Sequence, residues 1–344
     1  MRNYSIKSVK ELMYNAEKIV IVSHYNPDGD AIGSALALYH FFTALNRPVE
    51  IVMPNLFPDF LKWIPGSENI LIAMKHLNTA KKIFQNADLL FVVDMNAAHR
   101  SGADLQQAIL DSPAVKVLID HHPNPELPCH YQYSTTKTTS TCELVYNFIA
   151  KKLRLKSYIN LDIARCIYTG MITDTGSLSY ACNYENTYKI LAHCAKLGVD
   201  GEDIHRLIYD NYEVSRMKLL GLTLSDRLKI LPEYRTAVLH LSLKDLADNN
   251  YRIGDTEGFV NYGLSMKIVN FTAFFTERED RIRISFRSKG NFDVGKFAST
   301  HFTGGGHRNA SAANFNGTLE EAMQKFEEVL PQYQNELSST SEMY

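Results

Sequence analysis

One short segment of the chain gathers three side chains that can bind a metal ion. Residues 23–31 read Ser-His-Tyr-Asn-Pro-Asp-Gly-Asp-Ala, which places His24, Asp28 and Asp30 within one turn. Acidic groups that crowd together repel one another unless a cation neutralises them. The residue types and their spacing therefore predict a metal site.

Three further segments deliver acidic or imidazole groups at turns that follow buried elements. These candidates are Asp94, Asp120, His121, His122 and Asp174. Taken alone, such an aspartate is more typical of a helix cap or turn, and such a histidine of a satisfied core residue. Their recurrence in one topological place favours a shared metal centre.

The donor types favour some ions over others. Carboxylates with a few imidazoles suit Mn²⁺ or Mg²⁺, whereas structural zinc would need thiolates. The five cysteines form no Cys-x-x-Cys pair, and none lies in these turns. An odd cysteine count without a secretory leader predicts reduced thiols in a cytoplasmic protein rather than disulfides.

The elements that must position these residues follow the pattern of a parallel α/β domain. Apolar runs at 18–23, 88–94 and 115–120 are typical of buried parallel strands, and the spacing after Ala31 is typical of an amphipathic helix. Open α/β sheets bind ligands beyond the carboxyl ends of such strands. We expect strands and helices to alternate to about residue 195.

The chain of 344 residues is long enough for two domains. At its start, Ser8 and Glu11 predict a capping box that begins a helix. We expect a first domain at 1–195, a helical connector at 196–227, a second domain at 228–337 and a polar tail at 338–344. Within the second domain the pattern predicts strands at 236–241, 268–275 and 281–287, and helices at 256–266, 294–301 and 319–329.

Composition limits the classes of partner. The formal net charge is −2, whereas proteins that grip long nucleic acid usually carry a basic footprint. A short anionic substrate, which needs only a few local positive groups, fits better than duplex DNA. We also expect no membrane partner, because no apolar run approaches the roughly 20 residues that span a bilayer.

The strand predicted at 281–287 alternates apolar and basic side chains. Its apolar members should face the core, and Arg281 and Arg283 a solvated surface. Arg287 differs because it ends the strand, and its planar guanidinium suits a pair of phosphate oxygens.

Five motifs lie in order along nearly the whole chain. They are His-x-x-Pro-Asp-Gly-Asp-Ala at 24–31, Val-Asp-x-Asn at 93–96, Asp-His-His at 120–122, Gly-x-x-Thr-Asp-Thr-Gly-Ser at 170–177 and Gly-Gly-Gly-His at 304–307. Together they resemble the DHH/DHHA1 phosphoesterases, and the length and layout are most similar to the stand-alone NrnA-type members. The chain departs from the family at Ala310-Ser311-Ala312, where Ala-Ala-Gly is usual.

The resemblance implies a fold and a metal centre. The fold is α/β, with an N-terminal parallel-sheet DHH domain that has helices on both faces, a smaller α/β C-terminal DHHA1 domain, and an active-site cleft between them. The metal centre holds two divalent cations, with Mn²⁺ favoured over Mg²⁺ or Co²⁺. One ion would be bound by His24, Asp28 and Asp94, and the other by Asp30, Asp94, His121 and Asp174.

The resemblance also implies roles around the reacting phosphate. His122 would contact a phosphoryl oxygen, and Asp120 would orient a histidine or a ligand water, so both join Asp94 as catalytic candidates. Arg100 would pair with a metal carboxylate or a phosphate, unless it forms a structural salt bridge. Substrate-binding positions in the second domain would be Arg287, Ser288, Gly304, Gly305, Gly306, His307 and Asn309.

We therefore expect a two-metal phosphoesterase that hydrolyses very short RNA (nano-RNA) to nucleoside monophosphates and dephosphorylates 3′-phosphoadenosine 5′-phosphate (pAp). One alternative is a cytosolic phosphodiesterase that acts on cyclic di-AMP or its linear dinucleotide. Weaker alternatives are a poly- or pyrophosphatase and a non-catalytic nucleotide-binding regulator. The expected partners are short single-stranded RNA or small phosphorylated nucleotides, and the chain would be a monomer or a homodimer.

Overall fold

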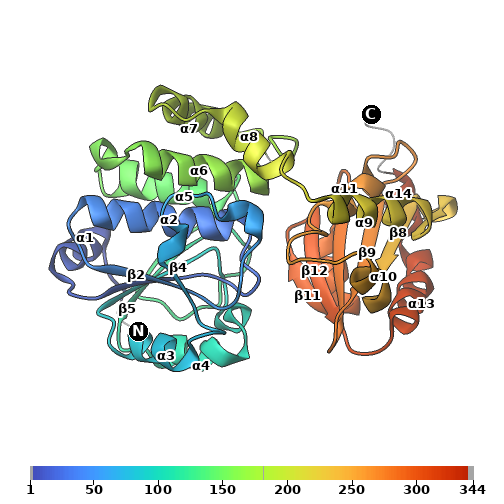
Figure 1. Cartoon of the computed structure of the whole chain (residues 1–344), viewed down its shortest axis with the longest axis horizontal. Helices are drawn as coiled ribbons and strands as arrows, with labels where there is room; N and C mark the ends of the chain where they lie inside the picture. Colours follow the sequence, from blue (N-terminus) through green and yellow to red (C-terminus); the bar gives the residue numbers. More distant parts are fainter. Residues whose placement is uncertain (1–2, 181, 340–344) are drawn as a thin grey trace. The chain divides into compact units, whose positions relative to one another are not determined.

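The computed structural model describes residues 3–180 and 182–339. The chain divides into two compact units, Met1–Asn211 and Tyr212–Tyr344. Both units combine helices with one sheet (Figure 1). Among the described residues, no helix is both long and apolar enough to cross a membrane.

The first unit is built on a parallel sheet of six strands in the order β3-β2-β1-β4-β5-β6. The chain direction across the sheet reverses between β1 and β4, so the carboxyl ends of these neighbours flank the crevice where such sheets bind ligands. The strands are β1 (Ile19–Val22), β2 (Val49–Met53), β3 (Ile70–Ile72), β4 (Leu89–Val93), β5 (Val115–Asp120) and β6 (Tyr131–Ser134).

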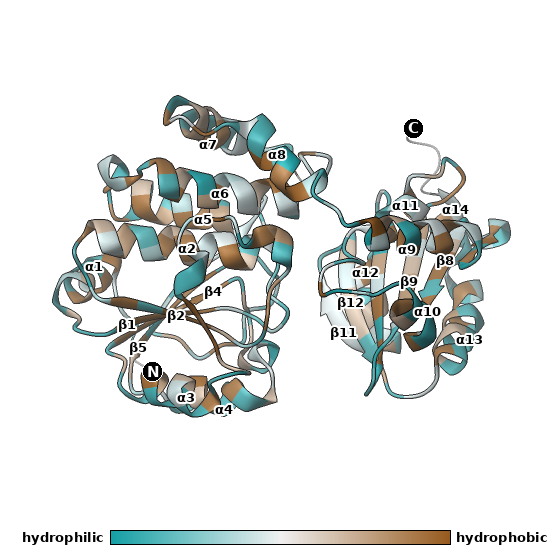
Figure 2. Cartoon of the chain, in the orientation of Figure 1, coloured by the Kyte–Doolittle hydropathy of each residue, from teal (hydrophilic) through white to brown (hydrophobic). Residues whose placement is uncertain are grey.

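Helices cover both faces of this sheet, as predicted (Figure 1). Ile19 and Ile21 pack on one side and Val20 and Val22 on the other, so β1 is buried on both faces. The strands are correspondingly hydrophobic in Figure 2. One layer contains α1 (Ile6–Asn15), α2 (Gly29–Ala44), α5 (Thr141–Asn147) and α6 (Leu161–Asp174), and the other contains α3 (Leu77–Gln85) and α4 (Ala103–Asp111).

The first helix begins one turn earlier than the sequence suggested. Ser5 is the N-cap, because its backbone is extended and its side chain accepts a hydrogen bond from the Ser8 amide at 3.1 Å. The predicted capping box of Ser8 and Glu11 is therefore wrong. Ser8 already has a helical backbone, and the same residue types recur at 5 and 8, so the pattern did not distinguish the two starts.

The predicted alternation of strands and helices to residue 195 is also wrong. Within the described part of the first unit, β6 is the last strand, and helices follow it. These helices pack on α2 and on one another, so their apolar faces are buried without any further strand. After α5 and α6 they are α7 (Glu185–Lys196) and α8 (Gly201–Tyr209).

The second unit is built on a mixed sheet in the order β11-β12-β10-β9-β8-β7. Only β8 and β9 pair in parallel; the other pairings are antiparallel. The strands are β7 (Leu228–Leu231), β8 (Thr236–Leu241), β9 (Phe271–Glu277), β10 (Ile282–Ser288), β11 (Thr303–Gly306) and β12 (Ala310–Phe315).

Helices also pack on both faces of this second sheet. One face carries α9 (Val214–Ser225), α10 (Leu243–Asp248) and α11 (Phe259–Leu264), and the other carries α12 (Val294–His301) and α13 (Leu319–Val329). The last helix, α14 (Gln334–Ser339), enters the segment predicted to be a polar tail, and residues 340–344 of that segment lie outside the described residues.

The basic face of β10 is less solvated than predicted. Apolar residues alternate with basic ones as expected, but Arg281 and Arg283 are half-buried. Burial, followed by the charge of Arg278, lowers the pKa of Arg283. The prediction of a solvated face treated the sheet as covered on one side only, whereas α11 lies against β10.

Candidate metal centre

Three neighbouring strands of the first unit deliver their polar residues to the same edge of the sheet. His24 follows β1, Asp94 follows β4, and Asp120 ends β5. Because β1, β4 and β5 are parallel neighbours, their carboxyl ends lie side by side. The first turn of α2 adds Asp30 and the last residue of α6 adds Asp174.

The carboxylate of Asp94 lies at the centre of this cluster. Its Oδ2 is 3.3 Å from Nε2 of His24, and its Oδ1 is 3.5 Å from Nε2 of His121. Each oxygen therefore faces a different histidine, an arrangement that suits a carboxylate bridging two ions. Asp94 is 2 % exposed and has a left-handed backbone with φ of 54°, a conformation that is uncommon outside glycine and clusters at functional sites.

One group of donors is formed by His24, Asp28 and Asp94. Nδ1 of His24 lies 3.0 Å from the carbonyl oxygen of Tyr25, so a proton on Nδ1 leaves Nε2 free to bind a metal. Nε2 is 3.8 Å from Oδ2 of Asp28. Asp28 also caps α2, because its Oδ1 accepts the amides of Asp30 and Ala31, so cap and candidate ligand coincide in one residue.

A second group of donors surrounds His121. Its Nε2 lies 3.9 Å from Oδ2 of Asp30, 3.5 Å from Oδ1 of Asp94 and 3.6 Å from Oδ2 of Asp174. Asp174 was expected in a turn after a shorter helix, but α6 continues through it and holds it at the helix end.

Asp120 is buried and orients His122. Its Oδ1 is 2.9 Å from Nδ1 of His122, and its Oδ2 accepts the His122 amide at 3.0 Å. Burial, followed by the nearby charge of Asp94, raises the pKa of Asp120 to about 7. These two contacts fix the orientation of the His122 ring, while the role of Asp120 in catalysis stays a prediction.

The electrostatics of the cluster fit a divalent cation. Burial raises the pKa of Asp30, and the charges of Asp94, Asp174 and Asp28 raise it further. For Asp94, burial would raise the pKa, but the hydrogen bond with His24 and the charges of His122 and His121 outweigh it and lower the pKa. Carboxylates that repel one another, together with imidazole nitrogens, are a ligand set that suits a divalent ion such as Mn²⁺ or Mg²⁺.

Two residues near the centre differ in how far the sequence revealed them. Arg100 was predicted, and its Nη1 donates to Oδ1 of Asn96 at 3.3 Å. Thr141 was missed, although its Oγ1 donates to Oδ1 of Asp94 at 2.9 Å. The available signal was the Ser-Thr-Cys-Glu run at 140–143, which resembles an ordinary helix start.

In the second unit, the Gly-Gly-Gly run forms the edge strand β11 rather than a loop. A Cβ at Gly304 would lie 2.3 Å from the Ala312 oxygen, and one at Gly306 would lie 2.7 Å from the Ala310 oxygen. These two glycines therefore allow β11 to pack on β12. A Cβ at Gly305 would meet no atom within 4 Å, so only this position leaves the backbone open.

The other predicted substrate positions gather beside β11, at one end of β10. Arg287 pairs with Ala310 across β10 and β12, and His307 follows β11. Ser288 is buried; its hydroxyl donates to the Phe292 carbonyl at 2.6 Å, and Asn309 donates to that hydroxyl at 3.0 Å. Ser288 and Asn309 thus stabilise the segment that follows β10, and this structural role is independent of any contact with a substrate.

The unusual Ser311 is accommodated by a helix rather than by the open face. Ser311 is buried, and its hydroxyl donates a hydrogen bond of 2.7 Å to the carbonyl oxygen of Val294. Val294 is the first residue of α12. The neighbouring Ala312 is exposed. The departure from the usual family pattern therefore adds a bond inside the second unit.

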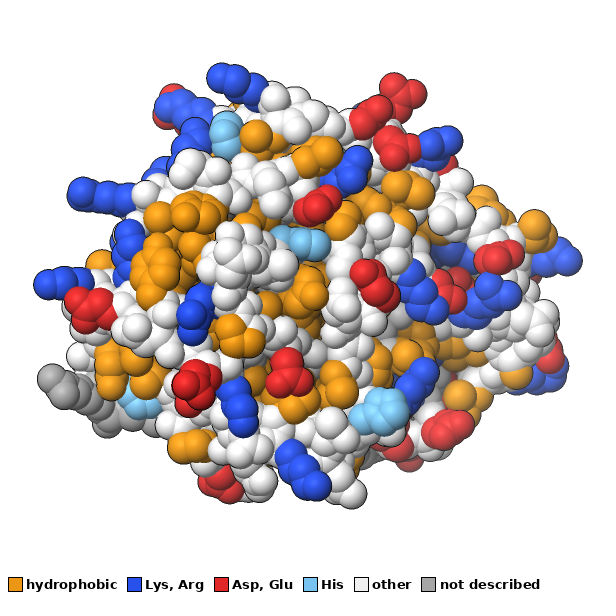
Figure 3. Space-filling view, turned by 60° about the vertical axis from the view of Figure 1, so that its left-hand side comes forward, with side chains coloured by type: hydrophobic (Ala, Val, Ile, Leu, Met, Phe, Trp, Pro, Cys, Tyr) orange, Lys and Arg blue, Asp and Glu red, His pale blue; other side chains and the backbone are white. Residues whose placement is uncertain are grey.

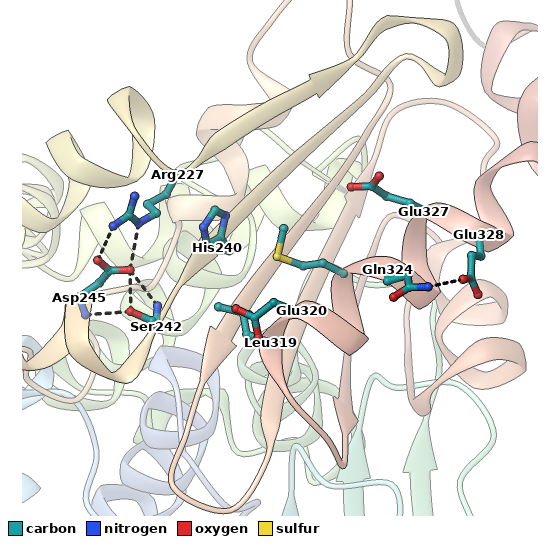
Figure 4. A pocket seen from close by; sticks show the side chains of 10 residues that line it. Arg227, His240, Ser242, Asp245, Leu319, Glu320, Gln324, Glu327 and Glu328 are labelled. Atoms are coloured by element: carbon teal, nitrogen blue, oxygen red, sulfur yellow. Dashed lines mark hydrogen bonds and ion pairs between the residues drawn. The ribbon is translucent and has the colours of Figure 1, made fainter.

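A groove in the second unit is lined by His240 of β8 and by residues of α13 such as Glu320 and Gln324 (Figure 4). It lies on the other face of the sheet from Arg287. Leu239 packs on the α9–α11 face, so the next residue along β8, His240, points to the α12–α13 face and lines the groove there. Phe286 packs on the α12–α13 face, so the next residue along β10, Arg287, points to the α9–α11 face. The polar groups of the groove largely bind one another, as in the pair of Arg227 and Asp245. This groove is therefore separate from the predicted substrate positions.

Charges on the surface are mixed. On the face in Figure 3, basic and acidic side chains are interspersed, in keeping with the net charge of −2. That face offers no continuous basic track of the kind that long nucleic acid requires.

Known proteins provide independent information about this chain. Residues 18–171 match the family described as "DHH family, N-terminal domain", and residues 235–336 match the "DHHA1 domain". The crystal structure of an exopolyphosphatase-related protein from Bacteroides fragilis is 41% identical and covers 97% of both chains, with a TM-score of 0.90.

Two curated relatives carry more specific names. The probable bifunctional oligoribonuclease and PAP phosphatase NrnA of Streptococcus mutans is 28% identical over 87% of this chain and 89% of its own. The cyclic-di-AMP phosphodiesterase GdpP of Bacillus subtilis is 24% identical over 95% of this chain, which spans about half (49%) of that protein.

Proposed function

This chain belongs to the DHH/DHHA1 family of metal-dependent phosphoesterases, and from that premise we propose that it hydrolyses short oligoribonucleotides to nucleoside monophosphates and dephosphorylates pAp. The observation that carries the proposal is the convergence of His24, His121 and the surrounding carboxylates on Asp94. Similarity to an NrnA over most of both chains supports the choice of substrate.

In this proposal two divalent ions, Mn²⁺ by preference, occupy the two donor groups. His24, Asp28 and Asp94 would hold one ion, and Asp30, Asp94, His121 and Asp174 the other. Bound there, the ions would lower the pKa of a water molecule and stabilise charge on the phosphoryl oxygens. A cluster that unites carboxylates with imidazoles, and in which the carboxylates repel one another without a cation, supports this assignment.

The chain's own residues would then bind and orient the phosphate. Asp120 holds Nδ1 of His122, and we propose that the other ring nitrogen, Nε2, donates to a phosphoryl oxygen of the substrate. Arg287 and the open backbone at Gly305 would bind a terminal phosphate or nucleoside, with His307 as a further contact. Anchoring one end of a substrate selects short chains, and we propose cytoplasmic nano-RNA and pAp as those substrates.

Two other activities are supported by a specific comparison. The solved relative at 41% identity carries an exopolyphosphatase-related name, and the cyclic-di-AMP enzyme shares about half its length with this chain. We rank the cyclic-di-AMP activity below the proposed one because the NrnA similarity extends over most of both proteins, whereas this chain spans about half of the cyclic-di-AMP enzyme. The exopolyphosphatase-related name states a relationship rather than a measured activity, so polyphosphate is included in the substrate panel.

A substrate panel with Mn²⁺ tests the proposal. The panel compares pAp, RNA of two to five nucleotides, cyclic di-AMP, pyrophosphate and polyphosphate at equal concentration. We expect the highest turnover on pAp and the shortest RNA. Highest turnover on polyphosphate, pyrophosphate or the cyclic compound would replace the proposed substrate.

A pair of variants on one strand tests the site. Asp94→Ala should reduce turnover by at least about 100-fold, since even outer partners of metal ligands cost about 10–100-fold. Asp88→Ala is the matched control, because Asp88 accepts the Glu17 and Lys18 amides just before the opposite end of β4. Unchanged hydrolysis by folded Asp94→Ala would exclude the proposed centre.

A further inference from the structure

A short segment outside the metal-ligand motifs contacts two buried carboxylates of the centre, Asp30 and Asp94. The Thr141 amide donates to Oδ2 of Asp30 at 2.6 Å, and the Cys142 amide donates to Oδ1 of Asp30 at 2.8 Å. The Thr141 hydroxyl donates to Oδ1 of Asp94 at 2.9 Å. Thr141 alone therefore bonds both carboxylates, one through its backbone and one through its side chain.

The bond to Asp94 determines how that carboxylate can rotate. Oδ2 of Asp94 faces His24, and Oδ1 faces His121 while it accepts the Thr141 hydroxyl. A carboxylate turned about its terminal bond would lose either the hydroxyl or the match to one histidine. We propose that Thr141 is a positioning residue of the metal centre, which holds one Asp94 oxygen toward each histidine so that both ions can bind.

A buried network around Glu143 holds the start of α5, where Thr141 lies. Glu143 is 3 % exposed and accepts the Thr139 amide at 3.2 Å and the Thr139 hydroxyl at 2.7 Å. The same carboxylate accepts hydrogen bonds from two residues of α7, from the Thr187 hydroxyl at 2.9 Å and from the side-chain amide of Asn186 at 2.6 Å. An acceptor with this many donors fixes the start of α5, and hence the place of the Thr141 hydroxyl.

The hydroxyl acts through Asp94 rather than on the ions, so its removal should affect metal binding more than folding. Thr141 and Asp94 are both essentially inaccessible to solvent, so bulk water does not readily replace the lost donor. Outer partners that orient metal ligands typically change affinity by about 10–100-fold. We expect that range for Thr141→Val, which keeps the shape of the side chain and removes only the hydroxyl.

The test measures Mn²⁺ binding by the metal-free full-length chain, using titration calorimetry for affinity and stoichiometry and electron paramagnetic resonance for the coupled ion pair. Thr141→Val should weaken at least one ion by about 10–100-fold and reduce the coupled signal. Thr141→Ser restores the hydroxyl and should bind like the wild type. Thermal unfolding confirms that each variant is folded.

Ser140→Ala is the matched control, because Ser140 caps α5 by accepting the Glu143 amide at 3.1 Å. This variant should lower the melting temperature and leave Mn²⁺ affinity unchanged. Wild-type affinity, stoichiometry and coupling in Thr141→Val would overturn the inference, as would an equal loss of affinity in Ser140→Ala.

The inference rests on the proposed metal-dependent function, but the two can fail separately. Suppose that the wild type and Thr141→Ser bind two Mn²⁺ ions more tightly than Thr141→Val does, but that the wild type cleaves nothing in the substrate panel. That result would reject the proposed substrates and support the role of Thr141. A chain that hydrolyses short RNA with unchanged metal binding in Thr141→Val would do the reverse.

Discussion

Replacing Gly170 by alanine should destabilise the first unit and weaken its metal centre. Gly170 lies inside α6, and a Cβ there would be 2.1 Å from Sγ of Cys142 and 2.9 Å from Oδ1 of Asp30. Cys142 is fully buried, with its sulfur 3.6 Å from the Asp30 carbonyl oxygen, so it has little room to move. The new methyl group would therefore push α6 away or displace Asp30.

The expected change in stability is opposite in sign to that of an ordinary glycine-to-alanine substitution in a helix. Alanine stabilises a helix by about 1 kcal/mol relative to glycine, whereas overpacking a core costs about 1–3 kcal/mol. A contact as short as 2.1 Å should cost an amount near the upper end of that range of overpacking energies. After the helix gain is subtracted, we expect Gly170→Ala to lower the free energy of unfolding by about 1–2 kcal/mol. Gly221→Ala in α9 is the matched control, because its Cβ would meet no atom within 4 Å, and it should gain up to about 1 kcal/mol.

Denaturant unfolding of the metal-free chain measures both effects. Trp63 is the single tryptophan and lies in the first unit, so its fluorescence follows the unfolding of that unit, and far-UV circular dichroism follows the whole chain. Mn²⁺ titration of Gly170→Ala should also show weaker binding, because Asp30 is one of the displaced groups.

A second substitution separates a close contact from a general loss of packing. Cys142→Ala should cost about 1 kcal/mol in the wild type, where it leaves a small void. In the Gly170→Ala background it should instead restore stability, because it removes the sulfur atom. Equal destabilisation in both backgrounds would refute the close contact as the cause, and a stabilising Gly170→Ala would refute the reasoning altogether.

The remaining predictions concern three other parts of the molecule. Mn²⁺ at 100 times its dissociation constant should stabilise the Trp63 transition by about 2.7 kcal/mol over chelated protein, and no shift would argue against a metal centre. Ser5→Ala should cost about 1 kcal/mol while Ser8→Ala stays within about 0.5 kcal/mol, which thermal unfolding can compare. The hydrogen bond from Arg227 holds the pKa of Asp245 at about 2, below its ordinary 3.8, so its stabilising effect is full above about pH 4 and is lost as pH falls through about 2. Asp245→Asn should therefore cost on the order of 1–2 kcal/mol at pH 7, after a discount for solvent screening at the partly exposed Arg227. A difference in unfolding free energy from the wild type that fails to narrow below pH 4 would contradict this.

The sheet of the first unit could be predicted because its strands are short, apolar and rich in β-branched residues, which is typical of buried parallel strands. Once β1, β4 and β5 are parallel neighbours, His24, Asp94 and Asp120 must share an edge. The sequence alone left the order of the strands unstated, and the family motifs supplied the grouping of the residues.

The predictions that were wrong involve patterns that two structures satisfy equally. Ser5 and Ser8 both resemble helix caps, and only the extended backbone at Ser5 decides between them. Asp174 follows glycine and threonine, residues typical of a turn, yet buried neighbours such as Met171 and Ile172 continue the helix through it. In both cases tertiary contacts outweigh local propensity.

The same ambiguity explains why the sequence predicts the candidate metal ligands but not the positioning residue Thr141. Candidate ligands such as His24, Asp30 and Asp94 follow a strand or begin a helix, so their places relative to an apolar run mark them. Thr141 begins a helix too, but its Ser-Thr-Cys-Glu context is already accounted for by the Ser140 cap, and nothing in that pattern requires the threonine hydroxyl to point at Asp94. The bond depends on a contact between residues 47 positions apart and on the left-handed turn at Asp94. The orienting bond is therefore determined by tertiary structure and not by the local sequence around Thr141.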